Sequence, residues 1–290
     1  MKAARRAISF RPVIINQPAG IEMNMTTLET NISITDVIGN IPYRMALAGG
    51  WIDQPFVSRH NPEPPGSMVV VSLHPTMRFM DRCGMGTSTR KVMTELWNGQ
   101  IPAGEPMELV RKAYAAENQW RPAPSGSQDM AGIIYPGINR LDYDFHHEGG
   151  YFPVHVESNT DPLVARWLEE RLYMVPVAPR PFGYDPLEKQ NLDPQWIHRL
   201  GQTGRDCFDA IVAKDAAALG RSMNECMLCW EAILPRTVYD TSISLDLMEL
   251  LGFYQKRYFG AMYSGCGGGY IYVVSEEAVP GGFQVKIRVS

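Results

Sequence analysis

The residues best suited to chemistry form one short glycine- and hydroxyl-rich stretch, which consists of Gly84, Met85, Gly86, Thr87 and Ser88. Apolar residues follow at helical spacing from 92 to 97, and this pattern predicts a glycine turn that leads into a helix N-terminus. Amide groups at such an end point outward unpaired and favour negative charge, so they bind phosphate. Hydroxyls beside them can hold a phosphate oxygen or Mg²⁺. A capped helix without a ligand has the same pattern.

A second polar stretch lies between residues 41 and 53. Residues 43–47 alternate as a strand does, with Arg44 on the face of small residues. A double glycine follows, and Gly50, Trp51 and Asp53 belong to this turn. An arginine on a small-residue face and an acid on a glycine turn indicate a polar pocket. An arginine that faces solvent on an edge strand is the alternative, and this segment alone does not decide between them.

Two further acids stand in suitable contexts. Asp129 ends a turn of small residues, 124–129. Glu117 lies near the C-terminal end of a helix expected to begin at Pro106. A carboxylate there faces the negative pole of the helix, at a cost of about 0.3–1 kcal/mol unless a cation is near. A metal ion would supply that cation, and so would Arg111 or Lys112.

A glycine cluster precedes the last expected strand, residues 270–274. Residues 265–269 read Gly-Cys-Gly-Gly-Gly, and Gly267 and Gly268 stand within this run. Consecutive glycines between two apolar strands weaken a sheet, unless another group must approach the backbone closely. A dinucleotide-binding fingerprint would need a helix after the glycines. This run leads into a strand, so a Rossmann site is disfavoured.

Two other clusters suggest metal binding but are better explained otherwise. Cys226 and Cys229 lie inside a helical pattern, and no second Cys-x-x-Cys completes a zinc site. We therefore expect buried, inert thiols. His146, His147 and Glu148 are followed by a glycine pair, and adjacent histidines point in different directions in most backbones. We expect a solvated loop there.

Composition bounds the class of protein. The 290 residues suit one large domain or two modest ones, and Lys and Arg number 27 against 31 Asp and Glu, a net charge of −4. No basic patch of the kind that binds nucleic acid is indicated. The longest apolar run, residues 68–71, is much shorter than a membrane span. Five cysteines without framework spacing suggest reduced thiols. We expect a cytoplasmic protein that binds neither nucleic acid nor membranes.

The surrounding elements follow from local signals. Residues 67–73 are expected to form a buried strand, and residues 173–178 another. Aspartate-proline pairs at 161–162 and 193–194 predict helix starts. Two or three helices should fill residues 193–234, and another should span 244–251 and end at Gly252.

Four segments, in this order, resemble the motifs of the GHMP kinases (galactokinase, homoserine kinase, mevalonate kinase and phosphomevalonate kinase). Residues 48–53 resemble the Ala-Gly-Gly-Gly-Thr-Asp run of the sugar-kinase branch, which includes heptose-phosphate kinases and fucokinase. Residues 84–88 resemble the Gly-Leu-Gly-Ser-Ser phosphate loop, and residues 126–129 resemble Gly-Lys-Gln-Asp. Residues 265–269 resemble the C-terminal glycine motif.

The resemblance implies an α+β, GHMP kinase-like two-domain fold. Its N-terminal part would be like domain 2 of ribosomal protein S5, and its C-terminal part would be ferredoxin-like. Residues 1–160 would form the ATP-binding domain, and residues 161–290 the C-terminal GHMP kinase domain.

The resemblance also implies roles for the candidate residues. Asp129 would be the catalytic base, with Arg44 beside it as the second catalytic residue. ATP would lie on the phosphate loop, formed by Gly84, Met85, Gly86, Thr87 and Ser88, and Mg²⁺ would be held by Ser88 and Glu117. The acceptor would contact Asp53, Gly50, Trp51, Gly267 and Gly268.

The expected activity is ATP- and Mg²⁺-dependent phosphorylation of a hydroxyl on a sugar or sugar phosphate, and a homodimer is left open. One alternative is a GHMP kinase with a non-sugar alcohol acceptor. The other is a catalytically weak nucleotide-binding or regulatory module on the same fold. Ser127, where the family has lysine, favours that last alternative, whereas the retention of Asp129 and Ser88 opposes it.

Overall fold

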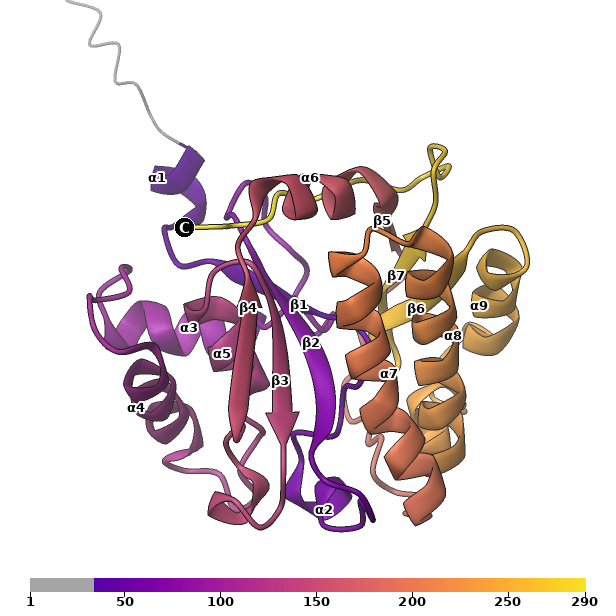
Figure 1. Cartoon of the computed structure of the whole chain (residues 1–290), viewed down its shortest axis with the longest axis horizontal. Helices are drawn as coiled ribbons and strands as arrows, with labels where there is room; N and C mark the ends of the chain where they lie inside the picture. The colour runs from indigo at the N-terminus through magenta and orange to yellow at the C-terminus, as the bar shows by residue number, and fades with distance from the viewer. Residues whose placement is uncertain (1–33) are drawn as a thin grey trace, which may run out of the picture. The chain divides into compact units, whose positions relative to one another are not determined.

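The computed structural model describes residues 34–290, so the first 33 residues of the expected N-terminal domain lie outside the described part. Within it, two antiparallel sheets fall on either side of residue 160 (Figure 1). The division into domains at that residue stays a prediction. The α-helices of the described part are α1 (Ile34–Ile38), α2 (Pro55–Ser58), α3 (Thr87–Leu96), α4 (Pro106–Asn118), α5 (Gln128–Ile134), α6 (Pro162–Arg171), α7 (Pro194–Val212), α8 (Ala216–Ile233) and α9 (Leu247–Gln255).

The first sheet has the order β1-β2-β3-β4 and is antiparallel throughout. Its strands are β1 (Tyr43–Ala46), β2 (Gly66–Leu73), β3 (Ile138–Tyr143) and β4 (His155–Asn159). All eight residues of β2 are buried, because both faces of this strand are covered. In Figure 1, α5 and α7 lie on opposite sides of the sheet, and both contact β2.

The second sheet has the order β5-β7-β6, again antiparallel. Its strands are β5 (Leu172–Pro176), β6 (Gly260–Gly265) and β7 (Gly268–Val274). Helices α8 and α9 pack on β6. The glycine cluster is the turn of the β6–β7 hairpin, where Gly267, Gly268 and Gly269 all have positive φ.

Local capping explains where most helices begin. Asp161 and Asp193 each accept hydrogen bonds from backbone amides of the helix that follows, and a proline occupies the first position of α4, α6 and α7. These predicted starts are confirmed. The prediction for α9 was wrong at both ends. Asp246 is its cap, and Gly252 lies inside the helix instead of ending it.

A C-terminal segment, residues 283–288, joins the two sheets. Phe283 bridges to Met174 of β5, and Ile287 bridges to Leu73 of β2. The guanidinium of Arg288 then donates hydrogen bonds to the last carbonyls of α5, at 3.0 Å from Ile133 and 2.8 Å from Ile134. The yellow trace in Figure 1 follows this path.

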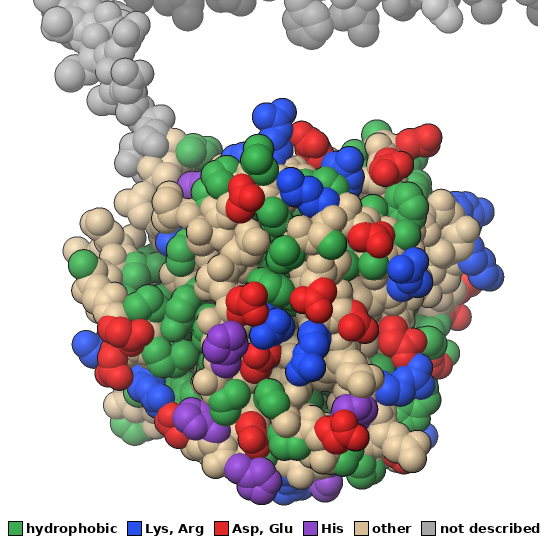
Figure 2. Space-filling model, in the orientation of Figure 1, with side chains coloured by type: hydrophobic (Ala, Val, Ile, Leu, Met, Phe, Trp, Pro, Cys, Tyr) green, Lys and Arg blue, Asp and Glu red, His purple; other side chains and the backbone are tan. Residues whose placement is uncertain are grey.

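On the face shown in Figure 2, acidic and basic side chains are interspersed, and no extended region of one sign appears. Among the helices of residues 34–290, none is both long and apolar enough to cross a membrane.

Candidate active site

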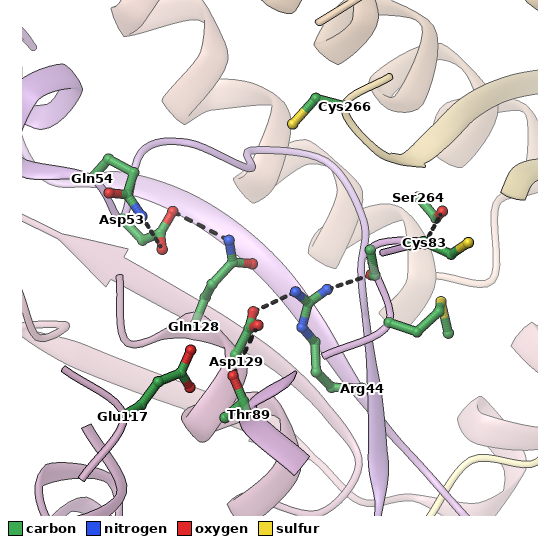
Figure 3. Close-up of polar contacts among 12 residues, drawn as sticks. Arg44, Asp53, Gln54, Cys83, Thr89, Glu117, Gln128, Asp129, Ser264 and Cys266 are labelled. Atoms are coloured by element: carbon green, nitrogen blue, oxygen red, sulfur yellow. Dashed lines mark hydrogen bonds and ion pairs between the residues drawn. The ribbon is translucent and has the colours of Figure 1, made fainter. Parts of the chain in front are cut away.

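An ion pair between Arg44 and Asp129 lies at the centre of the candidate site (Figure 3). Asp129 stands in the first turn of α5, and Arg44 comes from the middle of β1. Arg44 is only 6% exposed, so it does not face solvent as the edge-strand alternative required. A second guanidinium nitrogen of Arg44 donates to the carbonyl of Gly84, at 2.8 Å. The ion pair is thereby tied to the phosphate loop.

The loop itself has the backbone that its glycines predict. Gly84 has a φ of +72°, and Gly86, the cap of α3, has a φ of +67°. A Cβ at Gly84 would lie 2.1 Å from the carbonyl oxygen of Ser264, so only glycine fits between the loop and β6. Met85 is buried and accepts a hydrogen bond from the Tyr272 hydroxyl. Its side chain therefore belongs to the core, and only its backbone can contact a ligand.

The hydroxyl that contacts Asp129 is that of Thr89. Its oxygen lies 3.2 Å from a carboxylate oxygen of Asp129, and Thr89 is fully buried. Ser88 is exposed, because consecutive helical residues point in directions about 100° apart. The structure therefore does not bring Ser88 to the two acids as expected. The signal for Thr89 is its spacing, since Met93 lies one turn further on the same buried face.

Glu117 lies close to this group, although its cation is not one of those expected. Arg121 pairs with one carboxylate oxygen at 3.0 Å, whereas Arg111 pairs with Glu148. The other oxygen of Glu117 is buried and has no hydrogen-bond partner among the described residues. Burial raises the pKa of Glu117, the neighbouring hydroxyl of Thr89 lowers it, and the charge of Asp129 raises it again. In Figure 3 Glu117 and Thr89 lie on the same side of Asp129.

Asp53 is fully buried on the other side of the ion pair. Amide nitrogens of Gln54 and Gln128 each lie 3.4 Å from its carboxylate oxygens. Burial, and then the charge of Asp129, raise the pKa of Asp53 to about 7. A Cβ at Gly126 would lie 1.8 Å from the same carboxylate, so glycine is required for the two loops to meet.

The ion pair, Gly84 and the surroundings of Asp53 line one cavity of about 200 Å³, whereas Thr89 and Glu117 are not among its lining residues. Of the predicted residues, the structure brings together Arg44, Gly50, Trp51, Asp53, Gly84 and Asp129. Trp51 has a φ of +83°, where glycine is favoured, and its ring packs edge-on against Phe56 at 6.1 Å between centroids. The indole is thus held at the cavity wall by a strained, left-handed backbone conformation.

Two of the predicted acceptor glycines, Gly267 and Gly268, do not line the cavity. A Cβ at Gly267 would be 2.8 Å from the ring of Tyr184, and one at Gly268 would be 2.8 Å from the carbonyl oxygen of Ala178. Both therefore pack against residues 178–184. The preceding residues of the turn, Gly265 and Cys266, line the cavity in their place.

Trp230 and Arg180 are among the lining residues that were not predicted. Trp230 comes from α8, and its indole nitrogen donates to the Gly50 carbonyl at 3.1 Å. In the sequence it belongs only to an apolar helical pattern. Arg180 comes from the irregular segment between β5 and α7. Nothing in the local sequence marks Arg180 as a site residue.

The described residues contain no group of three or more His, Cys, Asp and Glu side chains that could hold a metal ion. Glu148 pairs with Arg111 on the surface. All five cysteines are free and buried, as expected.

No protein-family model matches the sequence, and no curated protein does. Solved structures do match. Lactococcus lactis galactokinase complexed with galactose aligns with 86% of this chain and 93% of its own, at 12% identity and a TM-score of 0.56. Methanococcus jannaschii mevalonate kinase aligns with 81% and 89%, at 11% identity and a TM-score of 0.53. A D-glycero-D-manno-heptose 1-phosphate kinase from Bacteroides thetaiotaomicron aligns with 85% and 95%, at 13% identity and a TM-score of 0.50. The chain therefore has the α+β fold of the GHMP kinases, as its motifs predict.

Proposed function

We propose that this protein is an ATP- and Mg²⁺-dependent small-molecule kinase that phosphorylates a hydroxyl of a sugar or sugar phosphate. The observation that carries this proposal is the Arg44–Asp129 pair, which lies in a cavity and is bonded to the phosphate loop at Gly84. Phosphoryl transfer depends mainly on positioning and on neutralising charge, and both groups suit that task. The fold, which is shared with galactokinase and mevalonate kinase, supports the same class of reaction.

In this mechanism Asp129 accepts the proton of the acceptor hydroxyl. The hydroxyl oxygen forms a bond to the terminal phosphorus of ATP, the bond from that phosphorus to the bridging oxygen breaks, and ADP leaves. Arg44 stabilises the negative charge of the transferring group and holds the carboxylate of Asp129 in place through their ion pair. The side chain of Asp129 is 23% exposed, against 7% for Arg44, so the base is open to the cavity.

The residues present also fit a magnesium ion. Within residues 34–290, Glu117 has a buried carboxylate oxygen without a hydrogen-bond partner, and Thr89 places a hydroxyl next to Asp129. Oxygen donors of this kind suit Mg²⁺. Glu117 and Thr89 would hold the ion, with Thr89 in the place predicted for Ser88. A bound ion would neutralise charge on the nucleotide phosphates.

The wall around Asp53 favours a polyhydroxylated acceptor. The carboxyl group and the amides of Gln54 and Gln128 offer both donors and acceptors to hydroxyl groups. Trp51 and Trp230 add aromatic surface for the apolar face of a sugar ring. A non-sugar alcohol is the second candidate, because mevalonate kinase shares the fold to a similar degree.

The substitution at Ser127 gives little support to an inactive module. Ser127 is fully buried, and its hydroxyl lies 3.0 Å from that of Tyr143 in the core. The side chain is not among those that line the cavity. The side chain of Ser127 therefore forms no part of the cavity wall next to Asp129.

The test is ADP release from ATP and Mg²⁺ across free sugars, sugar phosphates and mevalonate. Asp129→Asn should lower turnover by about 10²–10⁴-fold, because an amide cannot accept the proton. Glu95→Gln removes an exposed acid of α3 and should leave turnover unchanged. Wild-type rates in Asp129→Asn would exclude the assigned base. If no acceptor increases ADP release by the wild-type protein, the kinase proposal is wrong.

A further inference from the structure

Arg180 is a cation in the cavity, and no acidic group within the described part of the chain forms an ion pair with it. The cavity is lined by two arginines and two aspartates. Arg44 is paired with Asp129, whereas within residues 34–290 no carboxylate lies within ion-pair distance of Arg180. The remaining acid, Asp53, is contacted by the amides of Gln54 and Gln128. The side of the cavity next to Arg180 therefore carries uncompensated positive charge.

Arg82, which lies just before the phosphate loop, holds the backbone of Arg180 in place. The backbone amide of Arg180 donates to the carbonyl of Arg82 at 3.2 Å, and the side chain of Arg82 donates back to the carbonyl of Arg180 at 3.0 Å. A further bond of 2.6 Å joins Arg82 to the carbonyl of Pro181. These reciprocal contacts join a segment of the C-terminal half to the loop that precedes Gly84.

Gly267 leaves room for the side chain of Arg180. A Cβ at Gly267 would lie 3.2 Å from the Cγ of Arg180 and 2.8 Å from the ring of Tyr184. The Nε atom of Arg180 lies 3.4 Å from the Arg82 carbonyl, and one terminal nitrogen lies 3.9 Å from the Cys266 sulfur. These contacts leave most of the donors of the guanidinium available to a ligand. The glycine motif thus supports the arginine rather than the acceptor.

We propose that Arg180 binds a phosphate oxygen between the phosphate loop and the β6–β7 turn, as a second cation beside Arg44. This inference rests on the proposed function. Arginine is suited to the role because its planar donors match phosphate oxygens in pairs. The phosphate has two sources, which are the terminal phosphate of ATP and a phosphate carried by the acceptor.

Four variants test the proposal: Arg180→Gln, Arg180→Lys, Arg82→Gln and Arg166→Gln. Arg180→Gln removes the charge, and Arg180→Lys keeps it. Arg82→Gln loosens the segment but retains Arg180, so it reports on a purely structural role. Arg166→Gln removes an exposed cation of α6 and should behave as wild type. The readouts are kcat and KM for free and phosphorylated acceptors, and thermal stabilisation by ATP, ADP and inorganic tripolyphosphate.

The two sources give different results. If Arg180 binds the nucleotide, Arg180→Gln loses the extra stabilisation by ATP over ADP, and kcat falls about 10²-fold for every acceptor. If it binds the acceptor, KM rises about 10²-fold for phosphorylated acceptors alone, and stabilisation by ATP is kept. In either case Arg180→Lys should recover part of the loss.

Two results would overturn the inference. One is an Arg180→Gln protein with wild-type constants and stabilisation. The other is an equal loss in Arg82→Gln, because the role would then be structural. Tripolyphosphate separates the inference from the kinase proposal. If tripolyphosphate stabilises the wild type but not Arg180→Gln, the phosphate site is supported even when no turnover is detected. If none of the phosphate probes stabilises the wild type, the phosphate site is excluded.

Discussion

At the scale of single residues, the protonation of Asp53 depends strongly on the fold. The side chain is fully buried, and Arg44, the cation that lowers its pKa, is engaged with Asp129. Burial therefore raises the pKa of Asp53 from 3.8 to about 7. Near neutral pH the carboxyl group is divided between a form that can donate a hydrogen bond and a form that only accepts one.

This pKa predicts a specific pH dependence of stability. Between about pH 4 and pH 7 the native protein keeps the proton of Asp53, which the unfolded chain releases. This group therefore makes the free energy of unfolding fall as pH rises through that window, and adds no further change above it. Asp53→Asn should remove this slope. The free energy of unfolding of the variant, relative to that of the wild type, should therefore increase from pH 4 to 7, and the difference should stay constant at higher pH.

Urea denaturation at several pH values measures the difference between the two proteins. Glu95→Gln, which changes an exposed acid, should give a curve parallel to that of the wild type. Parallel curves for Asp53→Asn and the wild type would show that Asp53 is ionised throughout.

Sequence reasoning identified the acids of the site better than the hydroxyls. Asp53 and Asp129 end short runs of small residues, and such local composition is visible in the chain. The choice between Ser88 and Thr89 depends on how α3 is rotated against α5, which no local pattern determines. The cation beside Glu117 was misjudged for a related reason, because Arg121 lies beyond the end of α4.

At the scale of elements, α7 packs closely against β2 and so covers one face of the first sheet. Gly201 and Gly204 of α7 contact the backbone of β2 so closely that no side chain would fit between the helix and the strand. A Cβ at Gly204 would be 2.0 Å from the carbonyl oxygen of Ser67. The helix therefore approaches the sheet backbone directly.

Gly204→Ala should destabilise the protein by about 1–3 kcal/mol, because the helix must move away from the strand. Gly252→Ala is the matched control. It also lies inside a helix, and a Cβ there would meet nothing within 4 Å. That change should stabilise by about 0.5–1 kcal/mol, since alanine favours helix more than glycine does. Urea denaturation midpoints measure both effects. Equal shifts in the two variants would disprove the close contact.

The elements that sequence reasoning missed are those made by packing. Helix α5 has seven residues and a glycine in its middle, so its local propensity is weak. It forms because it packs on β1 and β2, where a Cβ at Gly132 would lie 2.9 Å from the Cβ of Arg44. Helices α4, α6 and α7 were predictable because their caps are local in sequence.

At the scale of the whole molecule, the order of four motifs was enough to predict the fold, but only part of the cavity wall was predictable. Trp230 and Gly50 are 180 positions apart, and their hydrogen bond exists only in the folded chain. Arg180 reaches the site through Arg82, which is 98 positions away. Residues that complete a site from such distances leave no periodic or compositional signal.

Binding of ATP should be visible as stability of the whole protein. With Mg²⁺ present, ATP at 100 times its dissociation constant should add about 2.7 kcal/mol to the free energy of unfolding. A thermal melt with ATP and Mg²⁺, compared with Mg²⁺ alone, measures the effect. Gly84→Ala should abolish it, because a side chain there collides with β6. A melt that does not respond to ATP would argue against nucleotide binding by this fold.

The C-terminal segment has a consequence for biosynthesis. Translation delivers Asp129 and the rest of α5 long before Arg288, whose guanidinium satisfies the final carbonyls of that helix. During that interval the nascent chain lacks the segment that joins its two sheets. The helix that carries the proposed base, α5, then lacks the hydrogen bonds to its last carbonyls. Catalytic competence should therefore appear after residues 283–288 have left the ribosome, as a late step of maturation.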